Sequence, residues 1–310
     1  MMLSRLPDGS LLSTRENLSI LIMDSGMGGL SICAEIVEGL RSRAPFKKVA
    51  VTYFNAWPEQ ARGYNALSGS AERVRVFDQA LLGTLPFAPD IILIACNTLS
   101  ILYPQTDFCR HTALPVVGIV LFGVDMIHEQ LLARPDSQAI ILGTKTTIAA
   151  DRHRQALHDR GIDDQRIVSQ ACDQLATQIE KDPHGPVVRS MVEQFVQQAL
   201  EKVNNPQAHA FAALCCTHYG YSAQVFKKIF GARLSAGCTI LDPNRAMAQG
   251  LLAAFSHNRF DRTAIDVQVV SRIVWSARQV SAIAGLIEQR SFLTAEALVN
   301  YRPDPTLFAY

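Results

Sequence analysis

The chain has 310 residues, of which 48% are hydrophobic and 18% are charged, and its formal net charge is +1. This length and apolar content predict one or two domains with a sizeable buried core, and they exclude a disordered chain. A net charge near zero without a strong basic block gives no support for a nucleic-acid partner. No apolar run reaches the roughly 20 residues of a membrane helix, so we expect no membrane partner.

The first residues and the cysteines indicate the compartment. Residues 1–17 lack the long apolar region of a signal peptide, and we expect them to form a flexible leader. The seven cysteines are odd in number and scattered, without a C-x-x-C pair, which argues against a disulfide framework or a zinc cluster. We therefore expect a cytoplasmic protein with free thiols and no bound metal.

Short apolar runs alternate with amphipathic stretches along the chain. The strand-like runs are Ser19–Met23, Lys48–Phe54, Ile91–Ala95, Val116–Val120, Ala139–Leu142, Arg166–Ser169 and Ala210–Leu214. The helix-like stretches are Gly29–Arg41, Ala71–Leu82, Gly123–Leu132, Thr147–Arg160 and Val187–Val203. Continuous apolar strands separated by helices predict parallel sheets that helices cover on both faces. Such sheets bind ligands at the edge where the carboxyl ends of the strands meet.

Polar residues follow five of these strands directly. They are Asp24-Ser25-Gly26, Asn55, Cys96-Asn97-Thr98, Gly143-Thr144 and Cys216-Thr217-His218. Polar residues placed by chance would scatter to both strand ends, so this bias predicts a functional edge.

The segment Asp24-Ser25-Gly26-Met27-Gly28-Gly29 joins a strand to a helix. Its glycines permit close backbone approach, and the helix N-terminus offers N–H groups to an anion. The G-x-G-x-x-G spacing of dinucleotide sites is absent, and an ordinary capped turn is the alternative interpretation. Asp24 could act as a base or orient one.

Cys96 and Cys216 hold matching positions, one in each half of the chain. A thiol at a strand-to-helix junction lies near a positive helix end, which favours the thiolate, although a buried structural cysteine is the alternative for each. Removing an α-proton from one face of a carbon and returning it on the other needs a base and an acid. Two thiols can supply both without pyridoxal phosphate, and His218 could stabilise a thiolate.

Four segments together resemble the aspartate/glutamate racemase superfamily, and glutamate racemase most closely. They are Asp24–Gly29, Ala95–Ser100, Leu142–Thr147 and Cys216–Tyr219. The resemblance implies an α/β fold of two similar lobes, each a mainly parallel sheet flanked by helices, with the active site in the cleft between the lobes. The expected lobes are residues 18–110 with 222–280, and residues 111–221, followed by a C-terminal extension over 281–310.

The resemblance also implies roles for individual residues. Cys96 and Cys216 would be the paired acid and base, assisted by Asp24 and His218. The residues expected to bind substrate are Ser25, Asn97, Thr98, Thr146, Thr217 and Glu180. The implied activity is a cofactor-independent isomerase that racemises a small acidic amino acid or related carboxylate, and a homodimer is one option.

The segment after the second strand departs from the family. Ala56 stands where glutamate racemases carry an acidic residue, and Ala61-Arg62-Gly63 replaces their Pro-Tyr-Gly. His218-Tyr219-Gly220 likewise replaces His-Tyr-Pro. Arg62 and Gly63 are therefore added to the expected substrate-binding residues. A guanidinium facing the substrate would suit an additional anionic group, whereas the alternative is that Arg62 points to solvent.

Two other activities stay open from the sequence. A relative of the same fold could isomerise or decarboxylate a dicarboxylate, with one or two of these cysteines. A non-catalytic relative that binds an acidic ligand or a protein is the other alternative, although the presence of both thiols with Asp24 and His218 speaks against it.

Overall fold

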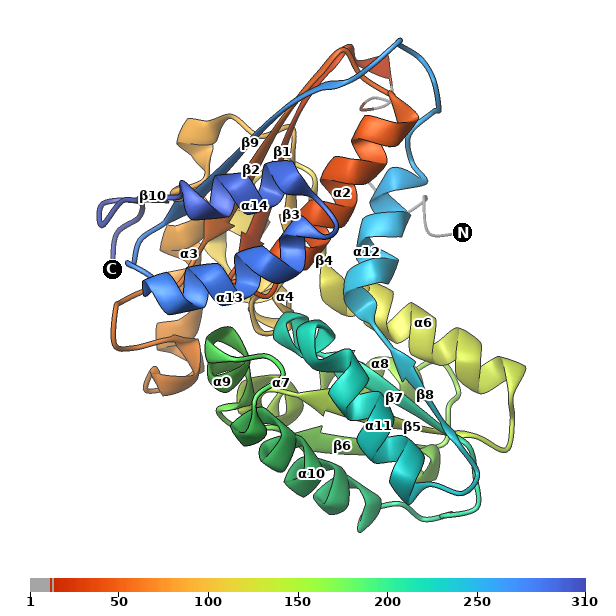
Figure 1. The fold of residues 1–310 in the computed structure, drawn as a ribbon. Helices are drawn as coiled ribbons and strands as arrows, with labels where there is room; N and C mark the ends of the chain where they lie inside the picture. Colours follow the sequence, from red (N-terminus) through yellow and green to blue (C-terminus); the bar gives the residue numbers. More distant parts are fainter. Residues whose placement is uncertain (1–11, 13) are drawn as a thin grey trace. The chain divides into compact units, whose positions relative to one another are not determined.

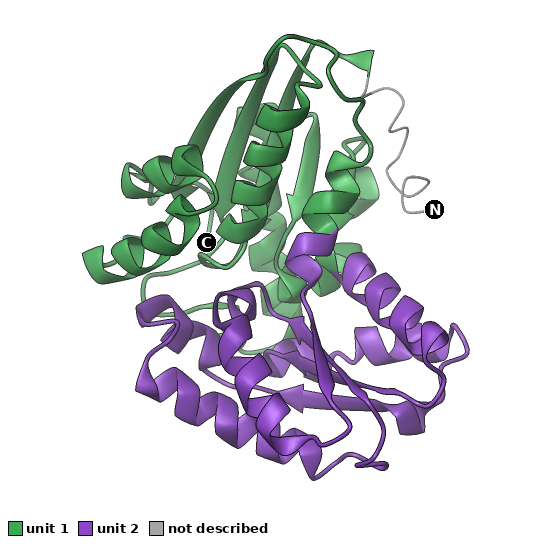
Figure 2. Cartoon of the chain, turned by 45° about the vertical axis from the view of Figure 1, so that its right-hand side comes forward, with its two compact units in different colours: residues 1–119, 247–310 green, residues 120–246 purple. Residues whose placement is uncertain are grey.

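The computed structural model describes residue 12 and residues 14–310. The chain forms two compact units, shown in two colours in Figure 2: Met1–Ile119 with Met247–Tyr310, and Val120–Ala246. The expected limits between lobes were 110/111 and 221/222, so the boundaries of the compact units lie further along the chain. Most of the expected leader lies outside the described residues, and the first strand begins at Asn17.

Unit 1 contains a parallel sheet with the strand order β10-β9-β2-β1-β3-β4. Its strands are β1 (Asn17–Asp24), β2 (Lys48–Asn55), β3 (Ile91–Ile94), β4 (Val116–Gly118), β9 (Ala264–Ser271) and β10 (Arg302–Pro303). β1 and β3 are almost entirely buried, because helices cover both faces of the sheet, as their continuous apolar sequences predicted.

The helices of unit 1 divide between the two faces of this sheet. One face carries α2 (Leu30–Arg43), α13 (Ala277–Glu288) and α14 (Phe292–Val299), as Figure 1 shows. The other carries α3 (Ser70–Leu82), α4 (Asn97–Leu102) and α5 (Asp107–His111). Residues 281–310, expected to be an extension, thus form α14, β10 and part of α13 within unit 1.

Unit 2 contains a second parallel sheet, with the order β6-β5-β7-β8. Its strands are β5 (Gln138–Gly143), β6 (Ile167–Ala171), β7 (Ala210–Cys215) and β8 (Cys238–Leu241). One buried cluster joins this sheet to α6 (Ile119–Ala133) and α8 (Arg152–His158). A second joins it to α9 (Leu175–Lys181), α10 (Pro186–Leu200) and α11 (Ala223–Arg233). α7 (Lys145–Ala149) follows β5, and α12 (Pro243–Leu252) leads back into unit 1.

The expected α/β class with two parallel sheets flanked by helices is confirmed, and all seven predicted strands form. Two local predictions need correction. The run predicted as a strand over 116–120 ends at Gly118, because Ile119 begins α6. The single helix predicted over 147–160 is divided into α7 and α8, because Asp151 adopts a left-handed conformation with φ 53°. Within the described part of the chain, no helix combines the length and apolar character needed to cross a membrane.

Candidate active site

Three polar segments of unit 1 meet at the carboxyl ends of neighbouring strands. The register pairs Asp24 with Asn55 across β1 and β2, and Met23 with Ile94 across β1 and β3. Asp24, Asn55 and the residues after Ile94 therefore lie at one edge of the sheet. The parallel strands produce this convergence, as the sequence predicted.

Cys96 lies at the N-terminus of α4 and is 7% exposed. The Ser25 Oγ atom lies 3.1 Å from the Cys96 Sγ atom, so the segment after β1 contacts the thiol directly. Asp24, the neighbour of Ser25, is fully buried. A Cβ atom on Gly29 would lie 2.7 Å from Asp24 Oδ2, so only glycine lets α2 begin this close to the carboxylate.

Two further polar side chains in unit 1 are buried without hydrogen bonds to any described residue. They are Asn97, through both atoms of its amide, and Tyr64, through its hydroxyl. Tyr64 belongs to the same buried cluster as Cys96. Burial, and secondarily the charge of Cys96, raises the pKa of Tyr64 well above its usual value. Buried polar atoms normally have partners, so these groups are suited to a bound polar ligand.

Sequence reasoning missed Tyr64. It lies in a short 3-10 helix, Tyr64–Ala66, in a segment without helix or strand periodicity. The available signal was a tyrosine directly after the expected substrate-binding pair Arg62-Gly63.

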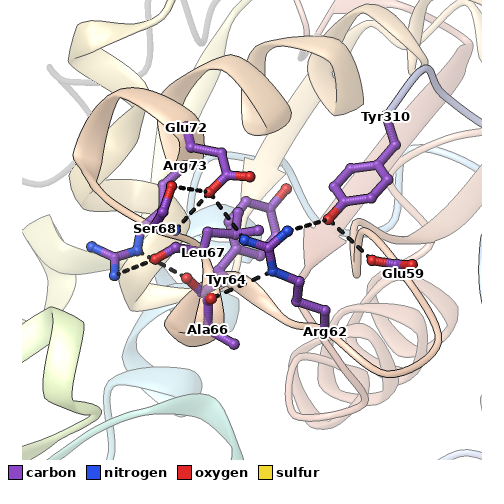
Figure 3. Close-up of polar contacts among 9 residues, drawn as sticks. All are labelled: Glu59, Arg62, Tyr64, Ala66, Leu67, Ser68, Glu72, Arg73 and Tyr310. Carbon is purple, nitrogen blue, oxygen red and sulfur yellow. Dashed lines mark hydrogen bonds and ion pairs between the residues drawn. The ribbon is translucent and has the colours of Figure 1, made fainter.

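The segment after β2 packs against the rest of unit 1 through hydrogen bonds and ring contacts. Asn55 donates to Ser271 Oγ at 2.8 Å and accepts from the backbone N–H of Trp57 at 3.2 Å. A Cβ atom on Gly63 would lie 2.4 Å from the Trp57 ring, so this glycine allows the indole to pack on the backbone. Arg62 is 39% exposed at its side chain, and its guanidinium forms an ion pair with Glu72 at 3.3 Å (Figure 3).

In unit 2, an imidazole lies between a thiol and a carboxylate and contacts both. The Cys216 Sγ atom lies 3.8 Å from His218 Nδ1, and His218 Nε2 lies 2.7 Å from Glu180 Oε1. All three side chains are buried, at 6%, 6% and 8% exposure. Burial alone would lower the pKa of His218, but hydrogen bonds to Cys216 and Glu180, and their charges, raise it well above its usual value. The imidazole between this thiol and this carboxylate therefore favours its protonated form.

Cys216 packs in a different buried cluster from the adjacent Cys215. Cys215 belongs to the cluster beneath α6, whereas Cys216 belongs to the cluster beneath α9, α10 and α11. Burial raises the pKa of both Cys215 and Cys172, which keeps these thiols protonated. The backbone carbonyl of Thr217 accepts a hydrogen bond from Asn244 Nδ2 at 2.8 Å, which fixes the turn after Cys216.

Several of the expected site residues lie beside one of the two thiols, whereas Arg62 and Gly63 lie in the segment after β2. Ser25, Asn97 and Thr98 accompany Cys96 in unit 1, with Asp24 at the same sheet edge. In unit 2, Thr217, His218 and Glu180 accompany Cys216. Thr146 lies on α7, directly after β5, the neighbour of β7 in the sheet.

The chain matches the family model described as Asp/Glu/Hydantoin racemase over residues 20–251. It is 28% identical over 237 residues to glutamate racemase of Vibrio vulnificus, covering 74% of this chain and 79% of that protein. It is 26% identical over 216 residues to glutamate racemase of Aquifex pyrophilus, covering 69% and 76%. The crystal structure of glutamate racemase from Francisella tularensis in complex with D-glutamate has a similar fold, with a TM-score of 0.65 and 17% identity over 88% of this chain and 94% of that one. The chain therefore belongs to the Asp/Glu/Hydantoin racemase family.

Proposed function

We propose that the protein racemises an acidic amino acid, glutamate or a close analogue, by two-base proton transfer with Cys96 and Cys216. The family match and the glutamate racemase relatives indicate an amino-acid racemase, an enzyme of the isomerase class. The observation that carries the finer proposal is the contact of Cys216 with His218, which is itself hydrogen-bonded to Glu180.

In the proposed reaction, the thiolate of one cysteine removes the α-proton. The C–H bond breaks, an S–H bond forms, and the electron pair stays on the carbon, shared with the adjacent carboxylate. The thiol of the other cysteine then gives its proton to the opposite face. One proton is taken and one is returned, so the scheme balances without an oxidant, a metal or a cofactor.

The neighbouring residues support a division of roles. His218, held by Glu180, would stabilise the Cys216 thiolate, and Ser25 would hydrogen-bond the Cys96 sulfur. Asp24 would assist on the Cys96 side. Ser25, Asn97, Thr98, Thr146 and Thr217 would bind the amino and carboxylate groups of the substrate.

The contacts of Arg62 bear on substrate choice. Its guanidinium is paired with Glu72 and also donates to the Ala66 carbonyl at 3.5 Å. Because this guanidinium already has a carboxylate partner, it is not needed to bind an additional anionic group of the substrate. We therefore favour a plain acidic amino acid over a substrate with a further charged group.

Solvent-deuterium exchange tests the mechanism. The purified protein is incubated in D₂O with each enantiomer of glutamate and aspartate, and with dicarboxylates for comparison, and deuterium at the α-carbon is followed by NMR. We expect exchange and racemisation with an acidic amino acid. Cys96→Ala and Cys216→Ala should each lower the racemisation rate by about 100-fold or more, the usual contribution of a positioned acid or base.

Cys109→Ala and Cys238→Ala are the matched controls, one in each unit, because both thiols are only partly buried. Their rates should equal that of the unmodified protein. Undiminished racemisation in either Cys96→Ala or Cys216→Ala would exclude the two-thiol mechanism. Turnover of dicarboxylates alone would indicate a different reaction, and tight binding of acidic ligands without any exchange would indicate a non-catalytic relative.

A further inference from the structure

The segment over residues 57–69, called the 57–69 loop below, connects β2 to α3 and carries Arg62, Gly63 and Tyr64. Its own contacts are dense. Arg73 donates to the carbonyl oxygens of Tyr64 at 2.9 Å and Leu67 at 3.1 Å. Trp57 donates from its indole to the Glu59 carbonyl at 2.7 Å. Apart from the short 3-10 helix Tyr64–Ala66, the loop is therefore ordered by hydrogen bonds rather than by regular secondary structure.

The last residues of the sequence pack against this region from more than 230 positions away. Leu307 and Phe308 are buried in the cluster that also contains Tyr64 and Cys96. The Arg272 guanidinium lies 5.1 Å from the Phe308 ring centre and 5.6 Å from that of Tyr310, and it donates to the Phe308 carbonyl. Arg272 thus holds the segment that ends in Tyr310.

Tyr310 contacts the 57–69 loop through its hydroxyl (Figure 3). The hydroxyl donates to Glu59 Oε2 at 3.2 Å and accepts from Arg62 Nη1 at 3.5 Å. It therefore joins a carboxylate and a guanidinium from the two sides of the turn between Glu59 and Arg62, which is closed by a backbone bridge. One phenolic oxygen fixes both sides of this turn.

Arg62 extends this connection to α3. Its other terminal nitrogen, Nη2, donates to Glu72 Oε2 at 3.3 Å, and the same oxygen accepts from the backbone and hydroxyl of Ser68 at 2.6 and 2.7 Å. Hydrogen bonds from Ser68, and then the Arg62 charge, lower the pKa of Glu72, which favours its ionised form. A continuous series of contacts thus runs from Tyr310 through Arg62 in the 57–69 loop to Glu72 on α3.

We propose that Tyr310 is a positioning residue: it holds Glu59 and Arg62 so that the 57–69 loop keeps Tyr64 in the buried cluster that contains Cys96. Arg62 acts in this series as a structural cation and not as a substrate ligand. The consequence for turnover rests on the proposed racemase function, whereas the consequence for access to Cys96 does not.

Thiol alkylation tests the proposal without a substrate. Tyr310→Phe, which removes only the hydroxyl, Tyr310→Ala and Arg62→Gln are treated with iodoacetamide, and the modification rates of Cys96 and Cys216 are measured by peptide mass spectrometry. We expect the modification rate of Cys96 to rise about fivefold in each variant. The reason is that the loss of one hydrogen-bonded contact makes local opening easier by about that factor. Cys216 lies in unit 2 and should keep its rate.

Arg154→Gln is the matched control, since Arg154 is also 39% exposed and pairs with an aspartate at 3.2 Å, in unit 2. It should change neither rate. The double variant Arg62→Gln/Tyr310→Phe should show less than the product of the single effects, because both act through one contact. With an acidic amino acid as substrate, KM should rise several-fold more than kcat falls.

An unchanged Cys96 rate in Tyr310→Ala overturns the proposal. So does a parallel rise at Cys96 and Cys216, which would mean general loosening, or the same response in Arg154→Gln. If Cys96 alone becomes more reactive but the unmodified protein racemises no acidic amino acid, the positioning by Tyr310 stands and the proposed function fails.

Discussion

His218 shows how single residues define the chemistry of this site. Its imidazole separates a thiol from a carboxylate, and the distances of 3.8 and 2.7 Å assign one ring nitrogen to each. Among the described thiols, Cys172 and Cys215 are buried and held in the protonated form, since burial raises their pKa. This contrast supports Cys216, rather than Cys172 or Cys215, as the thiol of unit 2 in the proposed proton transfer.

Removing the charge of Glu180 tests how much this carboxylate contributes to the raised pKa of His218. In the folded protein the pKa of His218 is raised above the value of about 6.5 expected for an unfolded chain. This protonation stabilises the fold fully below that pH, and the contribution is lost as the pH rises through the folded-state pKa. In Glu180→Gln we expect a lower pKa for His218, a weaker decline in unfolding free energy above neutral pH, and a racemisation rate reduced by about tenfold or more.

NMR titration of the His218 ring and denaturation at several pH values provide the measurements. Glu193→Gln, an exposed glutamate in unit 2, is the charge-matched control and should change neither quantity. A variant Glu180→Gln with an unaltered His218 titration would show that the carboxylate does not set the charge of the imidazole.

At the scale of elements, the start of α2 depends on one glycine. A Cβ atom at Gly29 would lie 2.7 Å from Asp24 Oδ2 and 2.9 Å from the Ala95 side chain. Gly29→Ala would therefore push α2 away from β1 and displace Asp24. We expect a loss of about 1–3 kcal/mol in unfolding free energy, typical of overpacking, together with reduced racemisation.

Gly285 provides the opposite case within α13, because a Cβ atom there meets nothing within 4 Å. Gly285→Ala should stabilise the protein by up to about 1 kcal/mol through helix propensity, with activity unchanged. Urea denaturation of both variants makes the comparison. A Gly29→Ala variant as stable as the unmodified protein would show that α2 can move without cost.

The elements that sequence predicts well are those with a strong local pattern. β1, β5 and β7 are continuous apolar runs followed by polar residues, and both features follow from a buried parallel sheet. The division between α7 and α8 escaped prediction because it depends on the conformation of a single residue, Asp151. β10 escaped because it has two residues and pairs only through tertiary contact with β9.

The candidate site likewise contains residues that the sequence predicts and residues that only the folded structure identifies. Cys96, Ser25, Cys216 and His218 could be predicted because they follow strands directly, and strand ends converge by topology. Tyr310 could not, because its partners Glu59 and Arg62 lie about 250 positions earlier in the chain. Contacts of this range leave no periodicity in the sequence, so only the folded structure identifies them.

At the scale of the whole molecule, the two units differ in how the chain builds them. Unit 2 is one continuous segment, whereas unit 1 is assembled from two segments that flank it. The sheet of unit 2 has a buried apolar cluster on each face, one with α6 and α8 and one with α9, α10 and α11. A continuous segment with its own core has the properties of an independent folding unit.

A fragment of residues 119–246 should therefore fold alone. We expect a cooperative urea transition with an unfolding free energy of about 5 kcal/mol or more, dispersed NMR signals, and a His218 pKa still raised, because Cys216 and Glu180 are both in the fragment. The comparison fragment 119–233 lacks β8, which pairs along β7, and should lose most of this stability. A broad, non-cooperative transition in the longer fragment would mean that unit 2 depends on unit 1 to fold, and that the charge of His218 has to be studied in the full chain.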